Sequence, residues 1–128
     1  MMQARRVVMF DAVSSSLSDL NRRIGFDLRI YSLHPGRLPA WLKMYEQYGH
    51  ATQVKHCGEP VFYSTTEVGT LNQVVHVWQY KSQADREKRR NALMKDPKFQ
   101  EYLKRSAGMG AHLHQESRIL KSTSFSPL

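Results

Sequence analysis

The chain has 128 residues, about the usual size of one domain, and we expect a single architecture built around one hydrophobic core. Hydrophobic residues make up 41% of the chain and charged residues 23%. No apolar run approaches the roughly 18 residues that suggest a membrane span. Cys57 is the only cysteine, which excludes an internal disulfide and favours a reducing compartment. We therefore expect a soluble cytoplasmic protein that does not insert into a membrane.

The net charge of +8 would suit nucleic acid or an acidic membrane surface, but the charge is unevenly placed. Residues 82–105 hold eight basic and four acidic side chains, a mixture typical of a solvated helix face. Within this segment, Arg86, Arg89 and Arg90 share one side of a helix. These arginines would either bind an acidic partner or simply form a solvated helix surface, on which Asp85 can pair with Arg89.

Residues 1–25 combine four arginines with a run of serines, loosely like an organelle transit peptide. Asp11 and Asp19 count against that interpretation, because transit peptides are poor in acids. We expect an N-terminal extension outside the main domain at 26–128. The mitochondrial matrix is the alternative to the cytoplasm.

The first half of the chain predicts a strand followed by a helix. Residues 26–33 alternate between apolar and polar side chains, as a two-faced strand does. Pro35 and Gly36 then turn the chain. Apolar residues between 38 and 45 recur at the spacing of an amphipathic helix, which Gly49 can end in a left-handed conformation.

Two strands and a capped helix come next. Segments 60–68 and 71–80 are rich in β-branched and aromatic residues and predict antiparallel strands joined by a hairpin. Ser82 is placed to cap a helix that runs to Lys95.

The last third of the chain predicts another helix and a strand. Asp96 suits the N-cap of a helix and Pro97 its first turn. Gly108 and Gly110 break that helix. Residues 112–120 then return to strand character.

The element order β-α-β-β-α-β predicts a ferredoxin-like α+β fold, an antiparallel sheet with both helices on one face. Strand parity assigns one set of residues to the helix side, namely Phe26, Leu28, Ile30, Val75 and Val77. It assigns a second set to the open face, namely Arg29, Tyr31, His76, Trp78 and Tyr80. A face with that much aromatic surface needs a partner.

Three partners would suit that face. A second copy would close two sheets into a dimeric α/β barrel with a partly polar interior. A small organic ligand undergoing oxidation or rearrangement would lie inside that barrel. RNA would stack its bases on Tyr31 and Trp78. Segment 71–80 lacks the basic residue, glycine and spaced aromatics of the RNA-binding consensus strand, so we expect no nucleic-acid partner.

Five blocks spread along the chain carry a family resemblance. They are IYSLHPG at 30–36, LNQVVHVWQY at 71–80, ADREKRRNAL at 84–93, DPKFQEYL at 96–103 and ESRILKSTSFSPL at 116–128. In this order and spacing they resemble the NIPSNAP family, and the compact chain looks like a bacterial member. The resemblance implies a ferredoxin-like fold paired into a dimeric α/β barrel. It carries over no catalytic motif.

His76 and Trp78 are the sharpest catalytic hypothesis. Related dimeric barrels include cofactor-independent and haem-degrading monooxygenases, in which a histidine could act as base or axial ligand and a tryptophan could shape the pocket. A lone strand histidine is more often a hydrogen-bonded interior residue. The first strand lacks the asparagine of the haem-degrading enzymes, so we expect no cofactor.

Arg29, Glu116 and Arg118 form a second candidate group, because the first and last strands of this topology are neighbours. An arginine there could clamp a carboxylate ligand in bidentate fashion. The alternative is that Glu116 pairs with one of the arginines and neutralises an interior charge.

Metal and nucleotide chemistry have weak signals. His112, His114 and Glu116 alternate like the ligands of a two-histidine, one-carboxylate metal site, but a neighbouring glycine suggests a loop. His56 beside Cys57 lacks a second pair that would complete tetrahedral coordination. No Gly-rich phosphate loop or nucleophile elbow occurs. We expect no metal site and no nucleotide chemistry.

The sequence therefore predicts a homodimer of uncertain biochemical role that binds a small ligand or a protein partner. The candidate pocket residues are Arg29, Tyr31, His76, Trp78, Glu116 and Arg118. The alternative is a cofactor-independent monooxygenase or isomerase that uses His76 inside the barrel.

Overall fold

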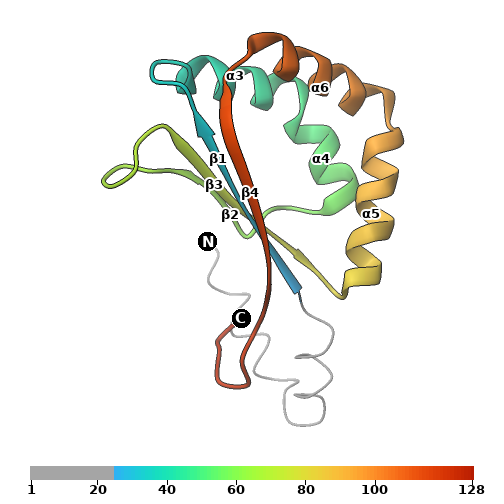
Figure 1. The fold of residues 1–128 in the computed structure, drawn as a ribbon. Coiled ribbons are helices and arrows are strands. Elements are labelled where there is room, and N and C mark those ends of the chain that lie inside the picture. The colour runs from blue at the N-terminus through green and yellow to red at the C-terminus, as the bar shows by residue number, and fades with distance from the viewer. Residues whose placement is uncertain (1–24) are drawn as a thin grey trace.

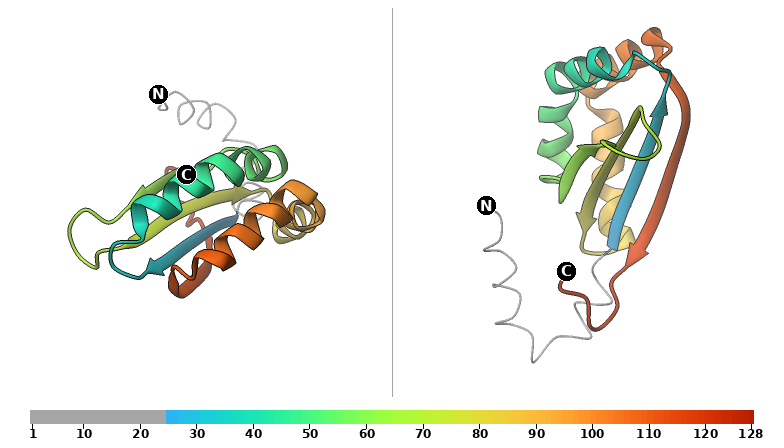
Figure 2. Two further views of the ribbon diagram at one scale, coloured as in Figure 1. Left: turned by 90° about the horizontal axis from the view of Figure 1, so that it is seen from above. Right: turned by 90° about the vertical axis from the view of Figure 1, so that its left-hand side faces the viewer.

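The computed structural model describes residues 25–128, so the predicted N-terminal extension lies outside the described residues except for Gly25. The elements in chain order are β1 Gly25–Leu33, α3 Leu38–Tyr48, α4 His50–Cys57, β2 Phe62–Thr65, β3 Gln73–Tyr80, α5 Gln83–Lys95, α6 Pro97–Met109 and β4 His112–Lys121. The strands form one antiparallel sheet in the order β2-β3-β1-β4, and α3 to α6 lie on one face of it (Figures 1 and 2). The predicted ferredoxin-like α+β fold is confirmed.

The predicted starts of the two helices in the second half of the chain are confirmed by their caps. The predicted break at Gly108 is wrong, since α6 continues through it to Met109. The Ser82 hydroxyl accepts a hydrogen bond from the backbone N–H of Asp85 at 3.1 Å, which starts α5. The Asp96 carboxylate accepts from the backbone N–H of Lys98 at 2.9 Å, which starts α6. Gly110 ends α6 at a φ of 58°, a left-handed conformation that glycine adopts without strain.

The crossover between β1 and β2 contains two helices where the sequence predicted one. The second helix, α4, has a polar buried side that includes Thr52 and Gln53 beside Cys57. Such a helix has no apolar periodicity, which explains why the sequence pattern did not indicate it.

The predicted left-handed conformation of Gly49 is wrong. Its φ is −116°, an ordinary value at the junction of α3 and α4. A Cβ atom on Gly49 would lie 2.8 Å from Cδ1 of Tyr102 and 2.9 Å from Cδ1 of Tyr45. The glycine is therefore required by close packing of this junction against α6, and not by its backbone conformation.

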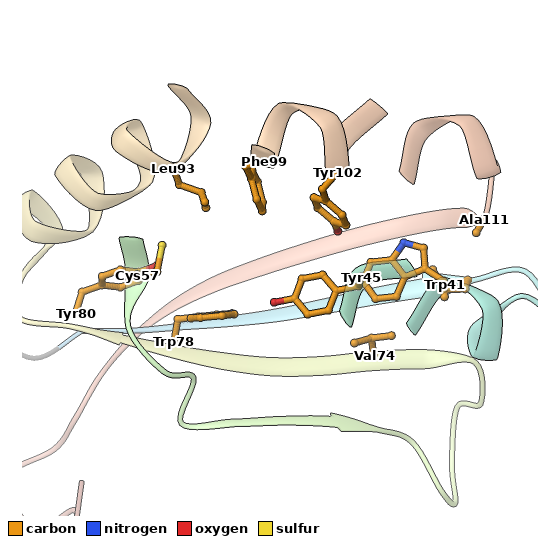
Figure 3. Close-up of a cluster of buried hydrophobic side chains, with 11 residues drawn as sticks. Trp41, Tyr45, Cys57, Val74, Trp78, Tyr80, Leu93, Phe99, Tyr102 and Ala111 are labelled. Atoms are coloured by element: carbon orange, nitrogen blue, oxygen red, sulfur yellow. The ribbon is translucent and has the colours of Figure 1, made fainter. Parts of the chain in front are cut away.

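The predicted assignment of the two sheet faces is also wrong, because it is reversed. Trp78 has no exposed surface and packs with Tyr80 and Val74 against the helices (Figure 3). On the neighbouring strand β1, Asp27 lies opposite Trp78, Arg29 opposite His76 and Tyr31 opposite Val74. These β1 side chains therefore also point to the helix side. Two contacts agree with this, since Arg86 of α5 donates to Asp27 and Trp41 of α3 contacts Tyr31. On β3 both faces are apolar enough to be covered, and on β1 the helix side is the polar one, so period-two alternation favoured the wrong face.

The open face of the sheet is instead mainly aliphatic. The residues of the central strands that lie there are Phe26, Leu28, Ile30, Val75 and Val77. On the edge strands, Phe62 lies beside Val77 and Leu120 beside Phe26, and both remain more than two-fifths exposed. In its middle this face stays partly exposed at Leu28, Ile30 and Val75. At one end Phe26 and Val77 are buried, and they line a pocket together with C-terminal residues that include Ser126 and Leu128.

Replacement of Gly49 by alanine should destabilise the fold. The added Cβ must displace two buried tyrosine rings, and we expect the free energy of unfolding to fall by about 1–3 kcal/mol. Urea denaturation followed by circular dichroism measures this change.

Gly108→Ala is the matched control, since Gly108 lies in α6 with nothing within 4 Å of an added Cβ. This variant should be as stable as wild type or more stable by about 0.5–1 kcal/mol. Equal effects of the two substitutions would contradict the packing role of Gly49.

Candidate functional site

A cavity of about 160 Å³ lies between the helix side of the sheet and the helices. Its floor comes from Arg29 and Tyr31 of β1, Tyr63 of β2, and His112 and Gln115 of β4. The helices contribute Tyr45, Gln53, Arg90, Met94, Phe99, Tyr102, Leu103 and Ser106. The wall is thus aromatic and basic, and no carboxylate is part of it. Met94 and Leu103 are partly solvent-exposed, which places the mouth of the cavity beside α5 and α6.

Tyrosine rings form much of the wall. Tyr45 stacks on Tyr63 with ring centroids 5.0 Å apart, and Tyr102 meets Tyr45 edge-on at 5.5 Å. Burial raises the pKa of all three phenols, and neighbouring tyrosines raise it further. Their hydroxyls are therefore protonated and able to donate hydrogen bonds. Tyr45 donates to Gln53 at 2.8 Å, whereas the buried hydroxyl of Tyr63 makes no hydrogen bond of normal geometry within residues 25–128.

Arg29 is held in the cavity floor by a buried carboxylate. Asp27 is fully buried, and its Oδ2 accepts from Arg29 at 3.2 Å and from Arg86 of α5 at 3.0 Å. Its Oδ1 accepts from the Ser117 hydroxyl at 2.7 Å. Burial opposes ionisation of Asp27, but the Ser117 hydrogen bond and the two arginines together keep its pKa below the usual value. The ionised Asp27 orients Arg29, whose Nε donates to the Tyr31 hydroxyl at 3.3 Å.

His76 lies in the same layer with a fixed tautomer. Its Nδ1 accepts a hydrogen bond from the Trp78 indole at 2.7 Å, so in the neutral ring the proton is on Nε2. Burial lowers the pKa of His76 to about 3, and the charge of Arg29 contributes. The ring stacks on Tyr63 at 4.4 Å and meets Tyr31 edge-on at 4.8 Å. Its Nε2 has no hydrogen-bond partner among the residues that the structure describes. A neutral His76 is therefore a hydrogen-bond donor and not a ready proton acceptor.

His112 faces the cavity because the β4 strand has an irregular register. His114 lies opposite Ser32 and His112 opposite Leu33, so two steps on β4 match one on β1. This bulge turns His112 to the helix side, where its ring meets Trp41 edge-on at 5.5 Å. The Nε2 atom of His112 is buried and has no hydrogen-bond partner in the described part of the chain.

The candidate pocket residues from the sequence are thus divided between the two faces. Arg29 and Tyr31 line the cavity, and His76 and Trp78 lie beside it in the helix-side layer. Arg118 and Glu116 lie on the open face, where they form an ion pair with each other. The predicted grouping of Arg29 with these two residues is wrong, because the sheet separates them.

Several cavity residues were not singled out from the sequence as site residues. They are Tyr45, Tyr63, Tyr102 and His112 as a ligand-facing residue. Arg90 was noted only as part of a basic helix face and not as a cavity residue. Tyr45 lies within the amphipathic spacing predicted for residues 38–45, and a correct choice of sheet face would have placed that helix above Arg29 and Tyr31. The orientation of His112 toward the cavity depends on the bulge in β4, for which the sequence has no signal apart from the nearby glycine.

The metal-site pattern of β4 does not form. The bulge places His112 and His114 on opposite sides, and Glu116 pairs with Arg118. Across residues 25–128, no cluster of three histidine, cysteine or acidic side chains could hold a metal ion. His56 instead contacts Asp96 at 2.8 Å. Within the same part of the chain, none of the helices is both long and apolar enough to cross a bilayer.

The fold and cavity together define a ferredoxin-like α+β protein with an internal pocket under its helix layer. The sequence model of the NIPSNAP family matches residues 26–127. The chain therefore belongs to the NIPSNAP family, as the five sequence blocks predicted.

Solved structures agree with this assignment. An uncharacterized NIPSNAP-like domain protein from Burkholderia xenovorans is 34% identical, with a TM-score of 0.76 over 84% of this chain and 91% of that chain. A NIPSNAP family protein of unknown function from Agrobacterium tumefaciens is 36% identical, with a TM-score of 0.76 over 84% and 95%. A Nitrosomonas europaea protein provisionally assigned as an antibiotic biosynthesis monooxygenase shares the fold, with a TM-score of 0.58 over 79% and 91% but only 9% identity.

Curated relatives are longer than this chain. The NipSnap homolog of Dictyostelium discoideum is 36% identical over 88 residues, which are 69% of this chain and 38% of that protein. Protein NipSnap of Drosophila melanogaster is 29% identical over 102 residues, which are 80% of this chain and 36% of that protein. The chain thus spans a little over a third of the length of these relatives.

Replacement of Asp27 by asparagine should destabilise the protein in a pH-dependent way. At neutral pH the substitution leaves Arg29 and Arg86 without their buried counter-charge, and we expect a loss of about 3–5 kcal/mol. Because the folded-state pKa of Asp27 is lowered, its ionisation stabilises the fold above the unfolded pKa of about 4. This stabilisation is lost as pH falls toward and below the folded-state pKa, so the free energies of unfolding of wild type and variant should converge in acid.

Urea titrations between about pH 7 and pH 3 measure this convergence. Glu101→Gln is the control, since it breaks an exposed ion pair with Arg105 and should cost at most about 1 kcal/mol. A difference between wild type and Asp27→Asn that stays constant into acid would show that the Asp27 charge does not stabilise the fold.

Proposed function

We propose that this protein binds a small organic molecule in the cavity between its sheet and its helices. The observation that carries the proposal is a cavity that contains polar groups without partners, the Tyr63 hydroxyl and His112 Nε2. Buried polar groups are normally hydrogen-bonded, so two such groups beside an aromatic cavity favour a ligand or ordered water there.

The size of the cavity restricts the ligand. An engineered protein cavity of roughly 150 Å³ holds one benzene molecule. The cavity of about 160 Å³ therefore suits a single ring with one small substituent. The surrounding tyrosines offer faces and edges to such a ring.

The hydrogen bonds of His76 favour binding over base catalysis. A monooxygenase or isomerase that uses His76 as a base would need a lone pair that the Trp78 indole already occupies at Nδ1. The protonated Nε2 could donate to a ligand oxygen without any change of tautomer. The weak similarity to the Nitrosomonas protein concerns the fold alone.

We further propose that the open face of the sheet pairs with the same face of a second copy. Central aliphatic residues such as Leu28, Ile30 and Val75 would be removed from water in both copies. Glu116 and Arg118 on the edge strand β4 carry opposite charges. In a two-fold arrangement, these charges of one copy can face the opposite charges of the other copy. This pairing would form a dimeric α/β barrel with an apolar interior. The ligand cavities would then lie outside that interior, one in each protomer.

A cytoplasmic location, with the mitochondrial matrix as the alternative, remains a prediction. The relatives with NipSnap names extend well beyond the matched region. The roles of those whole proteins cannot be transferred to this chain by the match alone.

Cavity binding predicts that a single-ring probe binds the wild type and that blocking the mouth abolishes binding. We would screen phenol, benzamide and benzoate by saturation-transfer NMR. Leu103→Trp should remove the signal, because a larger ring at this partly exposed position closes the mouth. Leu71→Trp, at an exposed loop position outside the cavity wall, should leave it unchanged. Absence of binding by all three probes to wild type would refute the proposed site.

Pairing through the sheet predicts that a charge at its centre separates the copies. Val75→Lys should raise the dimer Kd about tenfold or more, because two ammonium groups would enter an apolar interface. Ala92→Lys, at an exposed position of α5, should not change it. Analytical ultracentrifugation measures both. A wild type that is monomeric at micromolar concentration would overturn the proposed pairing.

A further inference from the structure

We infer that the cavity selects an anionic ligand, a small planar organic acid whose carboxylate or enolate oxygens are held by Arg29 and Arg90. This inference rests on the proposed binding function and specifies the chemistry of the group that is recognised. It follows from the local charges, from the hydrogen-bond donors that remain free, and from the shape of the wall.

The charges around the cavity do not balance. Two arginines, Arg29 and Arg90, line the cavity. Behind its wall, the buried carboxylate of Asp27 pairs with Arg29 and with a third arginine, Arg86. Asp27 is shared by Arg29 and Arg86, so the group carries two positive charges in excess. Within residues 25–128, Arg90 has neither an ion pair nor a side-chain hydrogen bond, although it is half-buried. A ligand anion would supply the missing counter-charge.

The pKa of His76 is lowered by burial and by the same positive charges. The charges of Arg29 and Arg90 both lower its pKa, after the larger effect of burial, while Asp27 raises it. Thus both arginines act on the region where a ligand would lie. His76 itself stays neutral and adds no positive charge, so the two guanidinium groups remain the source of the field.

The free hydrogen-bonding groups are mostly donors. Arg29 uses Nε for Tyr31 and Nη1 for Asp27, and its Nη2 makes no bond to the part of the chain that the structure describes. The Tyr63 hydroxyl is protonated and lies near the Tyr45 hydroxyl, but it makes no hydrogen bond of normal geometry to the described residues. A carboxylate has about four lone-pair positions and no donor of its own, which matches such a set. A neutral amide would bring a competing NH₂ group toward the guanidinium groups.

The wall opposite these donors favours a planar body. Phe99 and Tyr102 pack at 5.0 Å from each other, and Tyr45 lies edge-on to Tyr102. An aromatic or enolic acid of about ten non-hydrogen atoms would place its ring among these side chains and its oxygens toward Arg29 and Arg90.

The test compares benzoate with benzamide, two probes of nearly equal shape that differ in charge. Isothermal titration calorimetry should give a Kd for benzoate about tenfold lower than that for benzamide. Arg90→Gln should abolish this preference, and Arg90→Lys should restore part of it because the charge returns. Arg89→Gln is the matched control, since Arg89 is on the same helix but pairs with Asp85 outside the cavity wall. Arg90 is preferred over Arg29 as the target because Arg29 also neutralises buried Asp27.

The outcomes separate the inference from the proposed function. Benzamide binding as tightly as benzoate, with both blocked by Leu103→Trp, would overturn the anion preference and leave the binding site intact. Benzoate preference that survives Arg90→Gln in a variant with unchanged thermal stability would also overturn it. Failure of benzoate and benzamide to bind wild type, with phenol still bound, would overturn the inference and leave the site intact. Failure of all three probes would refute the site and the inference together. Higher ionic strength should weaken benzoate binding while benzamide binding stays constant.

Discussion

The buried carboxylate of Asp27 is the constraint on which the rest of this structure depends. It joins Arg29 of the same strand, Ser117 of the neighbouring edge strand and Arg86 of helix α5. An ionised group without exposed surface is stable only with such partners. The same contacts attach α5 and β4 to the centre of the sheet and hold Arg29 in the cavity floor. Stability and the geometry of the candidate site therefore depend on one charge network.

The two faces of the sheet differ in chemistry and, we propose, in purpose. The helix side carries aromatic, histidine and arginine side chains around a cavity. The open side carries aliphatic residues of the central strands, with Glu116 and Arg118 at one edge. Aliphatic surface suits association with a second copy, while the polar and aromatic side suits a ligand. Separation of the two means that the cavity of each protomer does not need the partner to complete its wall.

Much of the fold was predictable because its signals are local. Ser82 and Asp96 cap helices through atoms two or three residues away, so their sequence patterns were sufficient. Gly49 shows the limit of such rules. Its sequence position suggested a left-handed helix end, but the residue is needed because Tyr102, more than fifty positions away, approaches its backbone. The candidate site was predictable only in part: Arg29 and Tyr31 were identified, whereas Tyr45, Tyr63, Arg90 and Tyr102 were not.

By itself the sequence determined the family, the order of the four strands along the chain and the helix caps in the second half of the chain. These features depend on residue types within short segments. Only the tertiary structure decided which side of the sheet the helices cover. Alternation along 71–80 separates His76 and Trp78 from Val75 and Val77, but each set is apolar enough to be buried. The choice is made by the fit of Trp78 and Tyr80 against the helix side chains and by the pairing of Asp27 with Arg86, contacts between segments distant in the chain. That choice places His76 and Trp78 beside a cavity within the chain and leaves Val75 and Val77 on the open face.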